Sequence, residues 1–297
     1  MVSSIIEKMG YESDDKVVIT HIDDIAMSHS ANVAAFECLD FGVAKCGSII
    51  SVSGWLMEAA NTCKQSSNYD IGVHLTLTSE YNTYRWRPLS TSSIESGLLD
   101  TEGYLWKTVQ DANSNVNPKS AEIEMKAQID IALQNGIDVT HIDCHMGTVI
   151  FPKFLQSYIK LAREYKIPAF LPRVSKRQLI DYGFENLEGF VKKMMMDLDK
   201  ENYPLIDHLR AGPLEFIDDK IQYYCDLFNS LKPGLTHMLF HPAKMSSELK
   251  ALKHTPVERN QDYEAFTSQR LKKHVESLDI HLIGYRELRK FFRETLE

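Results

Sequence analysis

The sequence predicts an α/β fold of the distorted (β/α) TIM-like barrel class, built as a single domain over residues 1–297. Short apolar runs alternate with longer helical patterns along the whole chain, and no linker separates them. This alternation is typical of a parallel sheet covered by helices, and barrels of this length commonly form one domain. No G-x-G-x-x-G or P-loop motif follows the first apolar run, which disfavours nucleotide-binding folds. An open Rossmann-like sheet stays the alternative.

Each predicted strand is a β-branched or alternating apolar run bounded by turn residues. The predicted strands cover residues 17–22, 47–52, 71–78, 137–143, 169–174, 205–209, 236–240 and 280–283. Each predicted helix has spaced apolar residues, and some have clear end signals, such as Asn117-Pro118 at a start and Gly42 at an end. The predicted helices cover residues 28–41, 55–63, 118–135, 152–165, 185–198, 215–230, 262–277 and 286–296.

Residues 79–117 interrupt this rhythm and predict a loop or lid insertion in the barrel. The segment is rich in Ser, Thr, Asn, Tyr and Trp. Insertions of this length inside a compact domain are commonly binding loops or lids. Its aromatic side chains, Trp86 and Trp106, are candidate substrate-binding residues that would stack on a sugar or another planar ligand. The alternative is that they only pack the loop against the domain.

Composition and charge exclude several classes of function. The chain has 297 residues, 43% of them hydrophobic, and a net charge of −8 at pH 7. Without a block of basic residues, nucleic acid is not an expected partner. No apolar run approaches the ~20 residues that cross a bilayer, so a membrane is not expected as a partner either. Five cysteines without a C-x-x-C pair, and no signal-peptide pattern, predict a reduced, cytoplasmic protein.

Polar side chains stand at the end of the first predicted strand and within the third. Asp23 and Asp24 follow the apolar run 17–22, and His74 lies within the run 71–78. Strict alternation would point two adjacent carboxylates to opposite faces, so both can serve one site only if the strand ends there. A lone strand histidine is more often a core residue than a ligand, which leaves His74 ambiguous when it is considered alone.

The motif HIDCH at residues 141–145 is more informative. Period-two geometry places His141, Asp143 and His145 on one face, which is an unusual composition for a core strand. In a barrel, catalytic groups come from the carboxyl ends of several strands. Gathering Asp24, His74 and His145 at that end gives a carboxylate and two imidazoles with open positions, which predicts a metal site for Lewis-acid hydrolysis.

The motifs together resemble a known family. The segment VVITHIDDIAMSHSANVAAFECLDFGV resembles the opening of the YdjC-like carbohydrate deacetylases, the chitooligosaccharide deacetylase group. IGVHLTLT resembles the family's Gly-x-His-x-x-Leu-Thr strand, and HIDCH resembles its His-x-Asp-Ser-His strand. KPGLTHMLFHP and VERNQDYEAF resemble two late motifs, so the likeness covers nearly the whole chain.

This resemblance implies a distorted barrel that removes acetyl groups from N-acetylated sugars with one divalent metal ion. Asp24, His74 and His145 match the family's metal ligands. Asp23 matches its general base and His241 its general acid.

One further match and three departures bear on the substrate. Arg173 matches an arginine near the family's site, where it would orient a carboxylate or hold Asp23; a capping or surface function is the alternative. Ile25-Ala26 replaces the family's Phe-Gly, Met146-Gly147 stands where histidines are usual, and His21 stands where a small residue is usual.

The expected function is therefore metal-dependent deacetylation of a small saccharide. The cofactor is expected to be one divalent ion, with zinc or magnesium as the first candidates. Two alternatives stay open: another metal-dependent amide or ester hydrolase, and a saccharide-binding protein without catalysis. The sequence is compatible with a homodimer but does not fix the oligomeric state.

Overall fold

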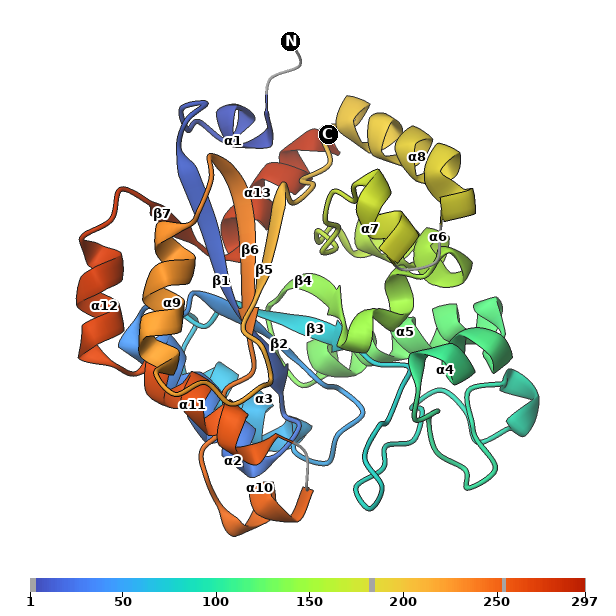
Figure 1. The fold of residues 1–297 in the computed structure, drawn as a ribbon. Coiled ribbons are helices and arrows are strands. Elements are labelled where there is room, and N and C mark those ends of the chain that lie inside the picture. The colour runs from blue at the N-terminus through green and yellow to red at the C-terminus, as the bar shows by residue number, and fades with distance from the viewer. Residues whose placement is uncertain (1–3, 182–184, 253–254, 297) are drawn as a thin grey trace.

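The computed structural model describes residues 4–181, 185–252 and 255–296, and its centre is a parallel sheet (Figure 1). The strands are β1 (Lys16–Ile25), β2 (Cys46–Ile49), β3 (Ile71–Leu75), β4 (Val139–Cys144), β5 (His208–Ala211), β6 (Gly234–Phe240) and β7 (His281–Ile283). Every strand pair in the described residues is parallel, as the alternating sequence pattern predicts.

The sheet forms a distorted barrel. Its strand order is β4-β3-β2-β1-β6-β5, and β7 pairs with the first half of β1 on the side where β2 pairs with the second half. Between β4 and β5 the segment 168–173 takes the place of a regular strand. Isolated parallel bridges join Ile142 to Ala169 and Pro172 to Ile206 across this gap. The α/β class predicted from the sequence is therefore confirmed, and no regular strand pairing closes the barrel between β4 and β5 in the described residues.

Helices surround the sheet (Figure 1). They are α1 (Ile5–Lys8), α2 (His29–Phe41), α3 (Leu56–Gln65), α4 (Val109–Asn115), α5 (Pro118–Gln134), α6 (Pro152–Tyr165), α7 (Lys176–Asp181), α8 (Glu188–Lys200), α9 (Lys220–Asn229), α10 (Ser247–Leu252), α11 (Pro256–Phe266), α12 (Gln269–Glu276) and α13 (Tyr285–Thr295). Asn117 caps α5 through Lys119 N–H, and Gly42 ends α2 in the left-handed conformation, as the end signals predict. None of the described helices is both long and apolar enough to span a membrane.

Several predicted boundaries were wrong. The predicted strand 169–174 forms only isolated bridges, and the predicted helix 262–277 is two helices, α11 and α12. The predicted strand 71–78 ends at Leu75, and the predicted strand 17–22 continues to Ile25. In each case the apolar pattern located the buried segment, but tertiary packing decided which backbone conformation it adopts.

The interior of the barrel changes from apolar to polar along β1. Val17 and Ile19 belong to an apolar cluster inside the barrel, while Ile22 faces the larger cluster formed with the helices. His21 and Asp23 continue the interior face of Val17 and Ile19, because side chains alternate along a strand. The polar end of this interior face is the carboxyl end of the strand.

The insertion at 79–117 is packed rather than extended. Arg85 donates to the Asp100 carboxylate at 2.7 Å and to the Leu105 carbonyl oxygen at 2.5 Å. The return of the insertion is anchored beside β3, where Ser79 N–H donates to Trp106 O at 2.7 Å. The segment also holds a short 3₁₀ turn (Ile94–Ser96) and α4. Closure of this segment over a substrate stays a prediction.

We predict that Arg85 stabilises the insertion. Its side chain is 5% exposed, and its removal leaves the Asp100 carboxylate without the guanidinium that pairs with it. Arg85→Ala should lower the free energy of unfolding by about 3 kcal/mol in urea titrations. The control is Arg87→Ala, an exposed residue whose guanidinium stacks on Tyr104 at 4.9 Å and which should cost about 0.5–1 kcal/mol. Equal losses in the two variants would contradict the prediction.

Candidate active site

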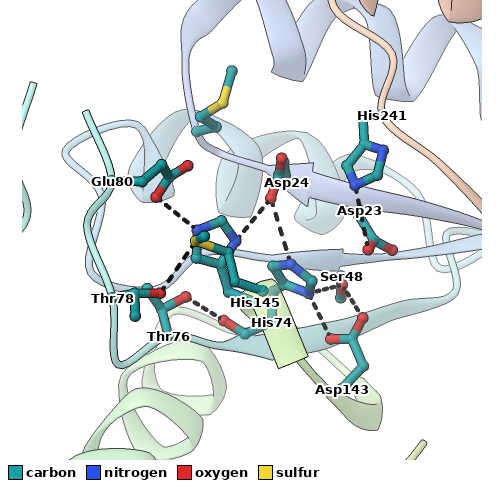
Figure 2. A network of polar contacts seen from close by, with 12 residues as sticks. Asp23, Asp24, Ser48, His74, Thr76, Thr78, Glu80, Asp143, His145 and His241 are labelled. Carbon is teal, nitrogen blue, oxygen red and sulfur yellow. Dashed lines mark hydrogen bonds and ion pairs between the residues drawn. The ribbon is translucent and has the colours of Figure 1, made fainter. Parts of the chain in front are cut away.

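The candidate active site lies at the carboxyl ends of the strands (Figure 2). β1 supplies Asp23 and Asp24, β3 supplies His74, His145 directly follows β4, and His241 directly follows β6. The structure therefore brings together all five residues predicted as metal ligands or as the acid and base. Barrel enzymes carry their catalytic groups at this end.

Two adjacent carboxylates reach one site because the backbone of β1 is irregular at its end. The pairing of β1 with β2 shifts register between Ile22 and Ile25, and Asp24 adopts a left-handed conformation with φ 64°. This breaks the strict alternation that would send Asp24 to the outside. The sequence argument requires the strand to end at the carboxylates. Instead, β1 continues to Ile25, and the bulge between Ile22 and Ile25 turns both carboxylates toward the site.

Asp24 lies between two imidazoles and one guanidinium. Its Oδ1 lies 3.4 Å from His74 Nε2 and 3.2 Å from His145 Nδ1, and its Oδ2 accepts from Arg259 Nη2 at 2.8 Å. Burial would raise the pKa of Asp24, but Arg259 and the two imidazoles hold it well below its usual value. Asp24 is therefore an ionised carboxylate in a buried position.

These three side chains fit a divalent metal ion. The ligand atoms of Asp24, His74 and His145 lie within 4.8 Å of one another. Asp24 Oδ1 is buried and makes no regular hydrogen bond among the described residues, and its near neighbours are His74 Nε2 and His145 Nδ1, which a shared cation would join to it. One carboxylate and two imidazoles suit zinc and similar divalent ions better than magnesium.

Each candidate imidazole ligand is held by a carboxylate on its other nitrogen (Figure 2). His74 Nδ1 lies 2.9 Å from Asp143 Oδ1 and 3.0 Å from Ser48 Oγ, and His145 Nε2 lies 3.0 Å from Glu80 Oε2. Such carboxylates fix the tautomer and the ring orientation of metal-binding histidines. The free nitrogens, His74 Nε2 and His145 Nδ1, are the ones that face Asp24.

The same carboxylates favour protonated rings when no cation is present. Burial alone would lower the pKa of His145, but Glu80 and Asp24 raise it to about 9. For His74, burial alone would also lower the pKa, but Asp143, Asp24 and Asp23 together raise it well above the usual value. Each ring must lose this proton before it can bind a cation.

Asp23 and His241 face each other beside this cluster (Figure 2). His241 Nε2 lies 3.7 Å from Asp23 Oδ2, and His21 Nδ1 lies 2.8 Å from Asp23 Oδ1. Burial would raise the pKa of Asp23, but the hydrogen bond from His21 and the nearby imidazoles lower it. Burial lowers the pKa of His241, and Asp23 partly opposes that effect. The backbone N–H of His241 donates to Asp262 at 3.0 Å, which fixes the chain after β6.

The three predicted substrate-binding residues have different surroundings. Trp86 is 3% exposed, and its ring packs against that of His145 with centroids 5.7 Å apart. Trp106 is partly buried and donates from Nε1 to Gly97 O at 2.7 Å. Arg173 forms ion pairs with Asp199 and Asp207, so the contacts described for it are not with Asp23. A contribution of these three residues to substrate binding stays a prediction.

Comparison with known proteins identifies the family. A family model described as YdjC-like protein matches residues 17–277. The chain belongs to the YdjC-like protein family. A carbohydrate deacetylase of Thermus thermophilus is 28% identical over 292 residues, covering 96% of this chain and 98% of the relative. A carbohydrate deacetylase of Thermoanaerobacter pseudethanolicus is 22% identical over 271 residues, covering 91% and 98%.

A solved structure has the same fold as this YdjC-like protein. It is a crystal structure of an Enterococcus faecalis protein proposed to cleave cellobiose phosphate. The two structures superpose with a TM-score of 0.74 at 23% identity, covering 92% of this chain and 99% of the other. At this identity the likeness supports the fold alone.

Sequence reasoning missed three residues of this site in the YdjC-like chain. Ser48 and Glu80 hold the two imidazoles, and Arg259 pairs with Asp24. Arg259 stands in a recognised motif, but it is 235 positions away from Asp24 in the sequence. No local pattern links residues at that separation, so only the fold could make the pair visible.

We predict that Asp24 and Arg259 are energetically coupled. Arg259→Met removes the guanidinium that pairs with the buried Asp24 carboxylate and should lower the free energy of unfolding by about 3 kcal/mol in urea with a chelator present. Asp24→Asn removes the need for the cation. The double variant should therefore lose at least about 1 kcal/mol less than the sum of the single losses. Additive losses would contradict direct coupling.

Proposed function

We propose that this YdjC-like protein is a metal-dependent deacetylase that removes the acetyl group from an N-acetylated saccharide. The observation that carries the proposal is the buried cluster of Asp24, His74 and His145, with Asp23 beside it. The names of the curated relatives support a carbohydrate substrate. A binding protein without catalysis would need neither an ionised carboxylate beside the cluster nor a facing imidazole.

Asp24, His74 and His145 would hold the ion. When bound there, a divalent cation supplies Lewis-acid polarisation of the acetyl carbonyl and activates water for attack. The carboxylates Asp143 and Glu80 keep both imidazoles oriented toward the shared centre. Zinc is the first candidate, because imidazole ligands suit it better than magnesium.

Asp23 and His241 would divide the proton transfers of hydrolysis. Asp23 would take the proton of the attacking water, because its carboxylate directly precedes the candidate ligand Asp24 and faces His241 across the site. His241 donates a proton to the amine that leaves when the amide bond breaks. The Asp23 carboxylate, 3.7 Å away, makes protonation of His241 easier than burial alone would allow.

The insertion would contribute to the substrate side of the site. Trp86 would act through its packing on His145, because its own ring is nearly inaccessible to a ligand. Trp106 retains partial exposure for a contact with the sugar. Nothing in the contacts of Arg173 supports its direct participation, since Asp199 and Asp207 occupy its guanidinium.

We predict one divalent ion per chain. Elemental analysis after expression in metal-supplemented medium should find one equivalent in the wild type and less than about a tenth of it in His74→Ala, because a ligand is lost. His281→Ala removes an exposed histidine outside the cluster and is the matched control, with unchanged metal content. Wild-type metal content in His74→Ala would refute this ligand set.

We predict that Asp23 and His241 are needed for turnover but not for metal binding. Asp23→Asn and His241→Ala should each lower kcat for acetate release from N-acetylated oligosaccharides by ~10²–10⁴-fold. Both variants should retain the metal content of the wild type, since neither residue is in the ligand set. Near-normal activity of Asp23→Asn would remove it as the base, and an inactive wild type would favour the binding-protein alternative.

A further inference from the structure

A line of polar side chains crosses the barrel interior beneath the candidate active site. It starts at Asp70, which precedes β3, passes through Thr140 and His141 of β4, and reaches His21 and Asp23 of β1. His141 Nδ1 lies 2.9 Å from Thr140 Oγ1, His141 Nε2 lies 2.8 Å from His21 Nε2, and His21 Nδ1 lies 2.8 Å from Asp23 Oδ1. Thr140 Oγ1 also contacts Asp70 Oδ1. The line therefore joins the amino end of β3 to the carboxyl end of β1.

The middle of this line is sealed from solvent. His21, Thr140 and His141 are fully buried, and Asp70 is 5% exposed. The His141 ring stacks on Tyr285 with centroids 3.8 Å apart and planes 14° apart, which fixes its orientation. In such an interior, each polar atom must find its partner among the protein's own groups rather than in bulk water.

Direct nitrogen contact disfavours a second metal site in this interior. A tetrahedral zinc ion would hold two imidazole nitrogens about 3.3 Å apart, given zinc–nitrogen bonds of about 2.0–2.1 Å. His21 Nε2 and His141 Nε2 are 2.8 Å apart, which is the distance of a hydrogen bond. One of the two rings therefore donates to the other.

The number of available hydrogens allows hydrogen-bond donation to run along the line in either of two directions. Thr140 has one hydroxyl hydrogen and two neighbours, Asp70 Oδ1 and His141 Nδ1. If Asp70 is protonated, it donates to Thr140, Thr140 to His141, His141 to His21, and His21 Nδ1–H to Asp23. If Asp70 is ionised, Thr140 donates to it, the imidazole bond reverses, and His21 Nε2 must carry a hydrogen.

The surroundings of Asp70 favour the first direction. Its Oδ2 already accepts from the backbone N–H of Arg286 at 2.7 Å, so Oδ1 is the oxygen free to carry a proton. Burial raises the pKa of Asp70, and Glu287 adds to this, while hydrogen bonds from Thr140 and Arg286 and the Arg286 charge only partly oppose it. When Asp70 is protonated, each of the four contacts in the line holds one hydrogen, with a donor on one side and an acceptor on the other.

We propose that Asp70, Thr140, His141 and His21 form a directional hydrogen-bonded chain that presents His21 Nδ1–H to Asp23 and so positions this carboxylate from the opposite end of the barrel. The catalytic consequence rests on the proposed function of Asp23 as the base. The direction of the chain does not, because it follows from the hydrogen count and from burial. His21 and Thr140 are positioning residues that act through Asp23.

Nitrogen-15 NMR of the histidine-labelled protein tests the direction without any activity measurement. His21 should carry its hydrogen on Nδ1 and leave Nε2 bare, while His141 should carry its hydrogen on Nε2; His21→Gln and His141→Gln spectra assign the two rings. Asp70→Asn should leave His21 Nε2 bare, because the amide N–H replaces the carboxyl O–H toward Thr140. A hydrogen on His21 Nε2, in either protein, would overturn the proposal.

Kinetics of one matched pair of variants test the positioning. Thr140→Val interrupts the line and should lower kcat about tenfold, the effect of about one hydrogen bond, with KM within about twofold and unchanged metal content. Thr236→Val is the control, because its buried hydroxyl has no hydrogen-bond partner among the described residues. Equal kcat in the two variants would refute the positioning. If the wild type releases no acetate, the proposed function fails, and the NMR result still decides the direction of the chain.

Discussion

The turn of the backbone at Asp24 is the constraint on which the candidate active site depends. A regular strand would send Asp23 and Asp24 to opposite faces, but the left-handed conformation at φ 64° places both at the mouth of the barrel. That conformation costs roughly 1–2 kcal/mol for a residue with a side chain. The buried ion pair with Arg259 holds Asp24 there and offsets part of that cost.

Backbone strain is concentrated around the same site. Ala26 and Met146 also adopt positive φ, at 68° and 52°, and each lies close in sequence to a candidate metal ligand. These are two of the positions at which the sequence departs from the resembled motifs, where Ala26 stands in place of the family's glycine. An alanine there carries strain that glycine avoids. The structure therefore accepts local strain where the candidate ligands must converge, as functional sites often do.

Apolar and ionisable side chains occupy opposite ends of the barrel interior. Apolar side chains, including Ile6 of α1 and Val17 of β1, close one end of the interior. Further along β1 the interior side chains are the His21 imidazole and then the Asp23 carboxylate. The carboxylates near the mouth each lie beside an imidazole or a guanidinium. This pairing lets several ionisable groups share a buried space, because each one lowers the desolvation cost of its neighbour. Under the proposed function, the mouth would hold the cation and transfer protons, while the apolar end maintains the fold.

Local sequence patterns determined the class of the fold and most of the candidate site. Period-two runs located most of the strands, and strand-end polar residues such as His74 and His145 lie together in the structure because the carboxyl ends of parallel strands meet. The sequence could not determine the irregular segment 168–173, the bulge at Asp24 or the contacts of Glu80 and Arg259 with the site. These depend on contacts between residues far apart in the chain, and no local periodicity records them. Tertiary structure alone decided them, because the free energy of a buried charge or a strained backbone is set by the groups packed around it.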